Sequence, residues 1–314
     1  MLKITPVVYM HLSHILWLRF FGHDFTIIIC HTLEIVNGGG ACYNTPMSQT
    51  ISTQAIVLRA ADYGEADRML TLLSPEHGKI SAKVRGCRKA GAKLAAAAQV
   101  FQSGEYFFAQ KSGRLTLAQC LPGEGYYGLR QSLPGLTTAA YFCNLCEEAA
   151  LPGQSDPELY NLLREGLAAL CQPEAPPNSV RGRFLMRFLV HQGYAPRLDF
   201  CASCHSPAEI TLPRYTGYAW DPQAGGLICY DCIKKQPGIA GRMRLSADDV
   251  TTLRDLQYKP LNDQAELLPN IIDALQAFLH AHMDRRFHSL EMLSALSSFS
   301  TVAHSTRRST SSST

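Results

Sequence analysis

Hydrophobic and polar residues alternate in short runs between residues 51 and 120. Apolar side chains recur at every second position there, which is the spacing of a strand with one buried face. Turn-forming groups such as Asp62-Tyr63-Gly64 and Ser112-Gly113 separate the runs. The pattern predicts five strands: Ile51–Arg59, Arg68–Ser74, Lys79–Arg85, Val100–Ala109 and Arg114–Cys120. Strands this short and close together suit a small closed barrel of the OB type, and a fragment of a β-sandwich is the alternative.

Beyond Pro122 the period changes to that of amphipathic helices, with apolar residues three and four positions apart. One helix begins clearly at Ser155-Asp156-Pro157, which offers a cap followed by a proline in the first turn. The predicted helices are Thr137–Leu151, the one that follows Asp156 and runs to about Leu170, Ser179–Gln192, Ser246–Gln257 and Pro269–Phe287.

Two cysteine pairs interrupt the helical part, Cys201-Ala202-Ser203-Cys204 and Cys229-Tyr230-Asp231-Cys232. A two-residue gap lets both thiolates of a turn point at one ion, and four thiolates make a closed tetrahedral zinc site. The 24 residues between the pairs slightly exceed the usual spacing, which a surface hairpin absorbs. We therefore predict a structural Zn²⁺ bound by Cys201, Cys204, Cys229 and Cys232. The alternative is one redox pair and one chance pair.

These patterns predict an α+β protein with an N-terminal OB-fold β-barrel and an α-helical domain that carries an inserted four-cysteine zinc finger. The barrel occupies 47–122, the helical domain 123–198 and 236–293, and the insertion 199–235. A third pair, Cys143 and Cys146, falls inside a predicted helix, where positions i and i+3 face the core together. We expect these two thiols to pack in the core rather than to bind metal.

The two ends of the chain differ from the rest. The apolar run Val7–Phe21 is too short and too polar to span a bilayer, and it lacks the order of a signal peptide. Because Met47 stands just before the first strand, we expect a native start there, and a non-native or disordered extension over 1–46. A membrane or targeting segment is the alternative. Residues 294–314, rich in Ser and Thr, predict a disordered tail.

Composition adds three limits. The net charge of +3 is mild, so any affinity for a polyanion has to come from local clusters of cations. Eleven cysteines, four of them assigned to metal, favour a reducing cytoplasm over a disulfide framework. No nucleophile–base pair, phosphate-binding glycine loop or paired carboxylate site stands out in the sequence, so we do not expect an enzyme.

One predicted strand gathers cations on one side. Ile80, Ala82 and Val84 alternate with polar residues, so period two places the cations on the outer face. The following loop adds more, and no acid stands between Lys79 and Lys93. The predicted strip for a nucleic-acid backbone consists of Lys79, Lys83, Arg85, Arg88, Lys89 and Lys93. A solvated edge strand is the alternative.

Three arginines, Arg181, Arg183 and Arg187, share the predicted helix Ser179–Gln192. An ordinary solvated face is the first interpretation. The other is a binding site for an acidic peptide, because guanidinium groups bind carboxylates with two parallel hydrogen bonds.

Several segments resemble the RecO family of bacterial DNA-repair proteins over about Met47 to Leu293. The strongest is Phe184-Leu185 with Gly193-Tyr194-Ala195-Pro196 running into the first cysteine pair. The others are Ala55-Ile56-Val57-Leu58-Arg59, Tyr63-Gly64-Glu65-Ala66-Asp67, Gly78-Lys79-Ile80-Ser81-Ala82-Lys83-Val84-Arg85-Gly86 and Leu94 with Gln99-Val100-Phe101.

The resemblance implies a DNA repair and recombination mediator of the RecF pathway. Such a protein binds single- and double-stranded DNA, anneals complementary strands and, with RecR, helps to load RecA onto strands coated by single-strand-binding protein. The resemblance also implies binding of that protein's acidic C-terminal tail, a stabilising zinc ion and a cytoplasmic, nucleoid-associated location without a membrane. The alternatives are a zinc-ribbon OB-fold protein that binds RNA in translation or transcription, and a thiol–disulfide enzyme.

Overall fold

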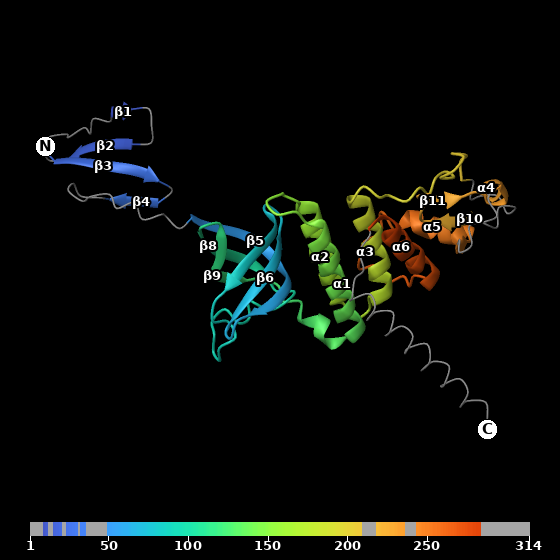
Figure 1. Cartoon of the computed structure of the whole chain (residues 1–314), viewed down its shortest axis with the longest axis horizontal. Coiled ribbons are helices and arrows are strands. Elements are labelled where there is room, and N and C mark those ends of the chain that lie inside the picture. Colours follow the sequence, from blue (N-terminus) through green and yellow to red (C-terminus); the bar gives the residue numbers. More distant parts are fainter. Residues whose placement is uncertain are drawn as a thin grey trace, which may run out of the picture. The chain divides into compact units, whose positions relative to one another are not determined.

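The computed structural model describes residues 49–208, 218–235 and 243–283, and the backbone of four strands that precede them. The chain divides into two units, residues 1–48 and 49–314. In the first unit, four strands pair in sequence order as an antiparallel sheet (Figure 1): β1 (Tyr9–His11), β2 (Ile15–Phe20), β3 (His23–Cys30) and β4 (Thr32–Ile35). The interpretation of residues 1–46 as a non-native or disordered extension stays a prediction. The predicted tail, 294–314, lies outside the described residues.

A closed five-stranded barrel opens the second unit (Figure 1). Its strands are β5 (Gln49–Tyr63), β6 (Asp67–Ser74), β7 (Gly78–Val84), β8 (Ser103–Lys111) and β9 (Arg114–Pro122). They follow the order β5-β6-β7-β9-β8, and a parallel pairing of β7 with β9 closes the barrel. The predicted OB-type barrel is thereby confirmed. β8 begins three residues later than predicted because Phe101, at φ 71°, still belongs to the preceding loop.

Residues 55–58 of β5 are buried on both faces of the strand, by the barrel core on one side and by the helical part on the other. Ala55 and Val57 point into the barrel, whereas Ile56 and Leu58 pack in the core of the helical part. A strand buried on two sides reads as a continuous apolar run instead of an alternating one. The barrel and the helices therefore share this strand as their common wall.

Residues 85–102, which we call the barrel loop, connect β7 to β8 and fill one end of the barrel. Cys87, Ala97 and Ala98 are buried with the barrel core. The hydroxyl of Tyr106 on β8 donates to the carbonyl oxygen of Ala97 at 3.1 Å. Three residues of this loop are thus part of the barrel core, whereas its cations are exposed.

The helical part packs around one large core. It contains η1 (Tyr127–Gln131), α1 (Leu133–Ala149), α2 (Pro157–Leu170), α3 (Pro177–His191), α5 (Ala247–Asp255) and α6 (Pro269–His282). Asp156 caps α2 by accepting from the backbone N–H of Leu159, as the sequence predicts. Phe142 of α1 stacks on Phe184 of α3 with ring centroids 3.7 Å apart. The stretch of the last predicted helix beyond residue 283 lies outside the described residues.

The third cysteine pair is buried in α1, which confirms its assignment to the core. Burial raises the pKa of the Cys143 and Cys146 thiols, so both stay protonated and unreactive at neutral pH.

A small sheet lies between α3 and α5 in the sequence. It consists of β10 (Tyr218–Asp221), β11 (Gly226–Ile228) and β12 (Met243–Leu245) in the order β11-β10-β12, with α4 (Tyr230–Lys235) after β11. On β10, Ala219 packs with the cysteines, whereas Tyr218 and Trp220 belong to the helical core. Successive side chains of this short strand point to opposite faces, so β10 packs against the helices on one face and against the cysteines on the other. We call residues 199–208, 218–235 and 243–245 the cysteine module. Among the described residues, no helix is long and apolar enough to cross a membrane.

Candidate metal centre and nucleic-acid interface

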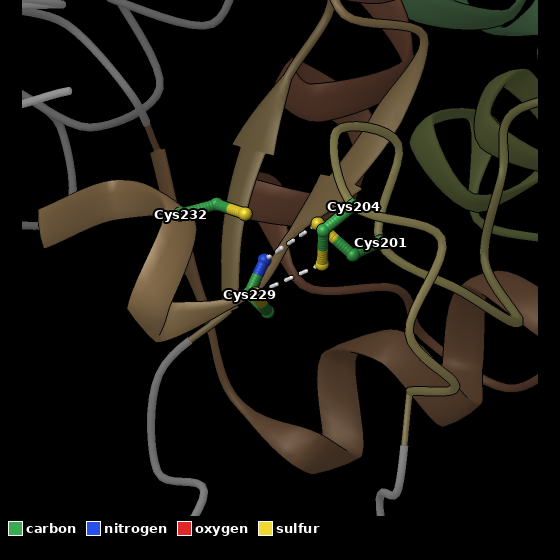
Figure 2. A group of neighbouring side chains, drawn as sticks. All are labelled: Cys201, Cys204, Cys229 and Cys232. Atoms are coloured by element: carbon green, nitrogen blue, oxygen red, sulfur yellow. Dashed lines mark hydrogen bonds between the residues drawn. The ribbon is translucent and has the colours of Figure 1, made fainter. Parts of the chain in front are cut away.

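The four predicted cysteines meet at one point. Cys201 and Cys204 lie in the loop after α3, Cys229 directly follows β11, and Cys232 lies in α4, with the sulfur atoms turned toward one another (Figure 2). All four Sγ atoms lie within 4.8 Å of one another. Tetrahedral coordination at about 2.3 Å places ligand sulfurs about 3.8 Å apart, and the Sγ atoms of Cys204 and Cys229 are 3.7 Å apart. The cluster therefore fits a four-thiolate metal site.

Hydrogen bonds to the sulfur atoms help to position the four cysteines. The backbone N–H of Cys229 donates to Sγ of Cys201 at 3.3 Å, which ties one pair to the other (Figure 2). Hydrogen bonds from Ser206 lower the pKa of the Cys204 thiol to about 6, whereas burial raises that of Cys232 to about 12. A metal ion binds thiolates, so its binding would favour the deprotonated form of all four thiols.

Trp220 anchors this module to the helices, and sequence reasoning did not identify it. Its indole N–H donates to the carbonyl oxygen of Ala274 on α6 at 2.9 Å, and its ring packs against Phe278 at 5.4 Å between centroids. One of two tryptophans in the chain, placed in a short apolar strand next to the cysteines, was the available signal.

The predicted alternation on β7 is confirmed, since Ile80, Ala82 and Val84 are buried and the intervening side chains are not. The cations, however, do not form one uniform strip. The Lys79 ammonium donates to the carbonyl oxygen of Glu147 at 2.6 Å, at the C-terminal end of α1, where the helix dipole favours a cation. Lys79 thus contacts the helical part, and its role in nucleic-acid binding stays a prediction.

Two further cations of the strip stabilise the turn between β5 and β6. Lys83 pairs with Asp67 at 2.8 Å, and that carboxylate also accepts from the backbone N–H of Gly86 at 2.7 Å. The hydrogen bond from Lys83 and then that from Gly86 lower the pKa of Asp67. Arg88 pairs with Asp62 at 3.3 Å. Acids distant from Lys79–Lys93 in the sequence therefore neutralise part of the strip.

The remaining three cations, Arg85, Lys89 and Lys93, are exposed. None is in an ion pair with another residue that the structure describes. We call these three the open cations. They leave three positive charges on the barrel loop available to a phosphate backbone.

The arginines of α3 divide in the same way. Arg181 and Arg183 are buried, so the interpretation as a solvated face is wrong for both. Packing of α3 against α2 and α6 covers that face. Burial lowers the pKa of both guanidinium groups. Arg187 remains accessible and lines two hollows of about 340 and 330 Å³ between α2, α3 and the segment after α5.

Comparison with known proteins matches the barrel and the helical part to two domains of one family. Residues 47–124 match the family described as "Recombination protein O N terminal", and residues 130–291 match "Recombination protein O C terminal". The chain is similar to the "DNA repair protein RecO" of Moorella thermoacetica, with 32% identity over 77% of this chain and 90% of that protein. A protein of the same name from Myxococcus xanthus is 32% identical over 76% of this chain and 95% of its own length. A barrel, a helical body and a four-cysteine module in this order, together with these matches, show that the chain belongs to the RecO family of DNA repair proteins.

Proposed function

We propose that this protein is a recombination mediator that binds single- and double-stranded DNA and anneals complementary strands. The open cations carry the proposal. They are exposed, unpaired among the described residues and borne by a loop that Cys87, Ala97 and Ala98 anchor in the barrel core. Several exposed cations on one anchored loop suit contact with successive phosphates of a nucleic-acid backbone.

The mechanism requires no covalent chemistry. Two complementary strands repel each other through their phosphates, and a protein that neutralises both lowers that repulsion. Release of condensed counterions supplies the driving force, so binding weakens steeply as salt rises. We propose that the protein makes and breaks no covalent bond and that it works on DNA in the cytoplasm, at the nucleoid.

The test is the salt dependence of binding to a short single-stranded oligonucleotide. For the variant with Arg85→Ala, Lys89→Ala and Lys93→Ala, we expect binding at least about tenfold weaker and a log–log salt slope shallower by about 2 units, since each lost phosphate contact removes about 0.7 on a single strand.

The matched control removes three exposed cations from the cysteine module, by Lys234→Ala, Lys235→Ala and Arg244→Ala. We expect it to bind like the wild type. Equal losses in both variants would contradict the assignment of the DNA contact to the barrel loop, and an unchanged slope in the first variant would contradict the electrostatic mechanism.

We further propose that the ion at the cysteine cluster is zinc. Four sulfur ligands in a closed set are typical of structural zinc, and zinc bound there would cross-link the loop after α3 to the segment after β11 without an open position for a substrate. Elemental analysis of the purified protein is expected to give one zinc per chain, and less than half an equivalent would contradict the proposal.

The acidic C-terminal tail of single-strand-binding protein is the proposed peptide partner, with Arg187 as its contact. Arg187 pairs with Glu165 at 3.3 Å. A carboxylate of the bound peptide would take the place of the Glu165 carboxylate in this ion pair. In fluorescence anisotropy with a tail peptide, we expect Arg187→Ala to weaken binding about tenfold, and Arg164→Ala, an exposed arginine of the same region, to leave it unchanged. The reverse result would move the site elsewhere.

Action together with RecR is the last part of the proposal. The decisive assay measures annealing of complementary strands coated with single-strand-binding protein, and then RecA filament formation, with and without RecR. Annealing that needs no added RecR, and filament formation that does, would support it. Failure of the protein to speed either process would contradict it.

A further inference from the structure

Tyr63 is the one exposed aromatic residue of the barrel, as far as the structure describes it. It is the last residue of β5, and its side chain is 53% exposed. The barrel's other aromatic rings, at positions 101, 106, 107 and 108, are buried or partly buried. Among the barrel's aromatic residues, Tyr63 is thus the one whose ring a ligand can reach.

The ring lies beside the cations described above. The ammonium nitrogen of Lys83 is 4.7 Å from the centroid of the Tyr63 ring. That distance is typical of a cation–π contact, which places the charge over one face. With half of the side chain exposed, the rest of the ring faces solvent at the border of the cationic surface.

The turn that carries Tyr63 is held in position by charged groups. The guanidinium of Arg88 donates to the carbonyl oxygens of Gly64 and Glu65, each at 3.2 Å, and pairs with Asp62. A further hydrogen bond joins the backbone N–H of Arg88 to the carbonyl oxygen of Ala66 at 3.0 Å. Arg88 thus fastens the barrel loop to the turn, and the aromatic ring and the open cations are parts of one ordered surface.

We propose that Tyr63 is a stacking platform for an unpaired base of single-stranded DNA, next to phosphates held by the open cations. Bases of every kind have a π face, so a single tyrosine adds affinity without selecting a sequence. A base inside a duplex is already stacked on its neighbours and gains little from the ring. The platform therefore gives the surface a preference for single strands, which cations alone do not provide.

This inference rests on the proposed DNA-binding function, and the experiment separates the two. The ligands are a thymidine oligonucleotide and an abasic-spacer oligonucleotide of equal length and equal phosphate number. We expect the wild-type protein to bind the thymidine oligonucleotide about tenfold more tightly, because stacking of one base on an aromatic ring contributes about that factor. In Tyr63→Ala this preference disappears, while the salt slope keeps its wild-type value.

Three variants exclude a purely structural effect. Tyr63→Phe keeps the π face and is expected to retain the preference, whereas Tyr63→Leu keeps an apolar side chain without that face and is expected to lose it. Tyr258→Ala removes a tyrosine that is 83% exposed in the helical part, and it is expected to leave binding unchanged. Thermal unfolding at wild-type temperature shows that each variant is folded.

Each remaining outcome overturns something specific. A Tyr63→Ala variant that retains the thymidine preference overturns the stacking platform and leaves the electrostatic function intact. The same holds if the wild type binds both oligonucleotides equally, with a steep salt dependence. If the wild type binds neither oligonucleotide at low salt, the proposed function fails together with the platform.

Discussion

The barrel and the helical part use charged and polar side chains in opposite ways. In the barrel, Lys83 and Arg88 stabilise a turn near the surface, and the open cations are exposed to solvent. In the helical part, Arg183 is 0% exposed and the indole N–H of Trp220 is buried against α6. Basic residues thus lie at the solvent-exposed surface in the barrel, whereas in the helical part some of them are buried and contribute to the packing of the fold.

The difference follows from how much of each element is covered. β7 packs one face into the barrel, and its other face stays available to solvent. α3 contacts α1, α2 and α6, so most of its circumference is buried from Ser179 to Leu189. A charge on a covered element must find partners inside the protein, or its burial is costly. Four predictions test this comparison.

The largest effect is expected from loss of a thiol of the four-cysteine cluster, where we propose a bound metal ion. Cys201→Ser removes a buried ligand, and because metal binding and folding of such a module are coupled, we expect loss of bound metal and a fall in the free energy of unfolding on the order of several kcal/mol. Elemental analysis and thermal unfolding measure both. Cys143→Ala, in the buried pair of α1, is the control and should retain the metal. Full metal content in Cys201→Ser would contradict the assignment.

Arg183→Ala should come next. The Arg183 side chain donates to the carbonyl oxygen of Ala265 at 2.5 Å and lies 3.8 Å from a carboxylate oxygen of Asp263. Its removal leaves a cavity and unpaired groups, so we expect the free energy of unfolding to fall by about 2–4 kcal/mol in chemical denaturation. Arg164→Ala, at an exposed position of α2, should change it by less than about 0.5 kcal/mol. Similar values for both would remove the contrast between the two regions.

Gly78→Ala tests the junction between the regions. Gly78 has φ 60°, and a Cβ atom there would lie 2.3 Å from the carbonyl oxygens of Leu151 and Gln154. We expect a loss of about 2–3 kcal/mol in thermal or chemical unfolding, because both the backbone strain and the clash are added. Gly113→Ala has φ 74° with nothing within 4 Å and should lose only about 1 kcal/mol. Equal losses would mean that strain alone acts at Gly78.

The smallest effect concerns pH. Lys83 and the N–H of Gly86 hold the pKa of Asp67 below its ordinary value of 3.8. The stability that this lowered pKa contributes is present above 3.8 and is lost as the pH falls through the lower, folded-state value. Unfolding followed between pH 5 and about pH 2 should therefore show a slightly steeper loss in the wild type than in Asp67→Asn. Parallel curves would contradict a contribution from this ion pair.

The barrel was predictable to a large extent, and the burial of individual charges was not. Alternation placed Ile80, Ala82 and Val84 inside correctly because a strand has a strict period of two. The neutralisation of Lys83 and Arg88 was missed because their partners, Asp67 and Asp62, precede them by 16 and 26 residues and come from the strands β6 and β5. Lys79 turns to α1 for a similar reason: a helix 68 residues further along the chain ends beside it.

Local spacing along the chain was enough to predict the strands of the barrel, the cap of α2 and the two cysteine pairs that meet as one cluster. The tertiary structure alone decided which charges are open. Whether Arg85 is free and Arg183 buried depends on what packs against each element, and packing joins residues that are far apart in the chain. The same holds for Tyr63, whose ring lies beside Lys83 only because β6 pairs with β5 on one side and with β7 on the other.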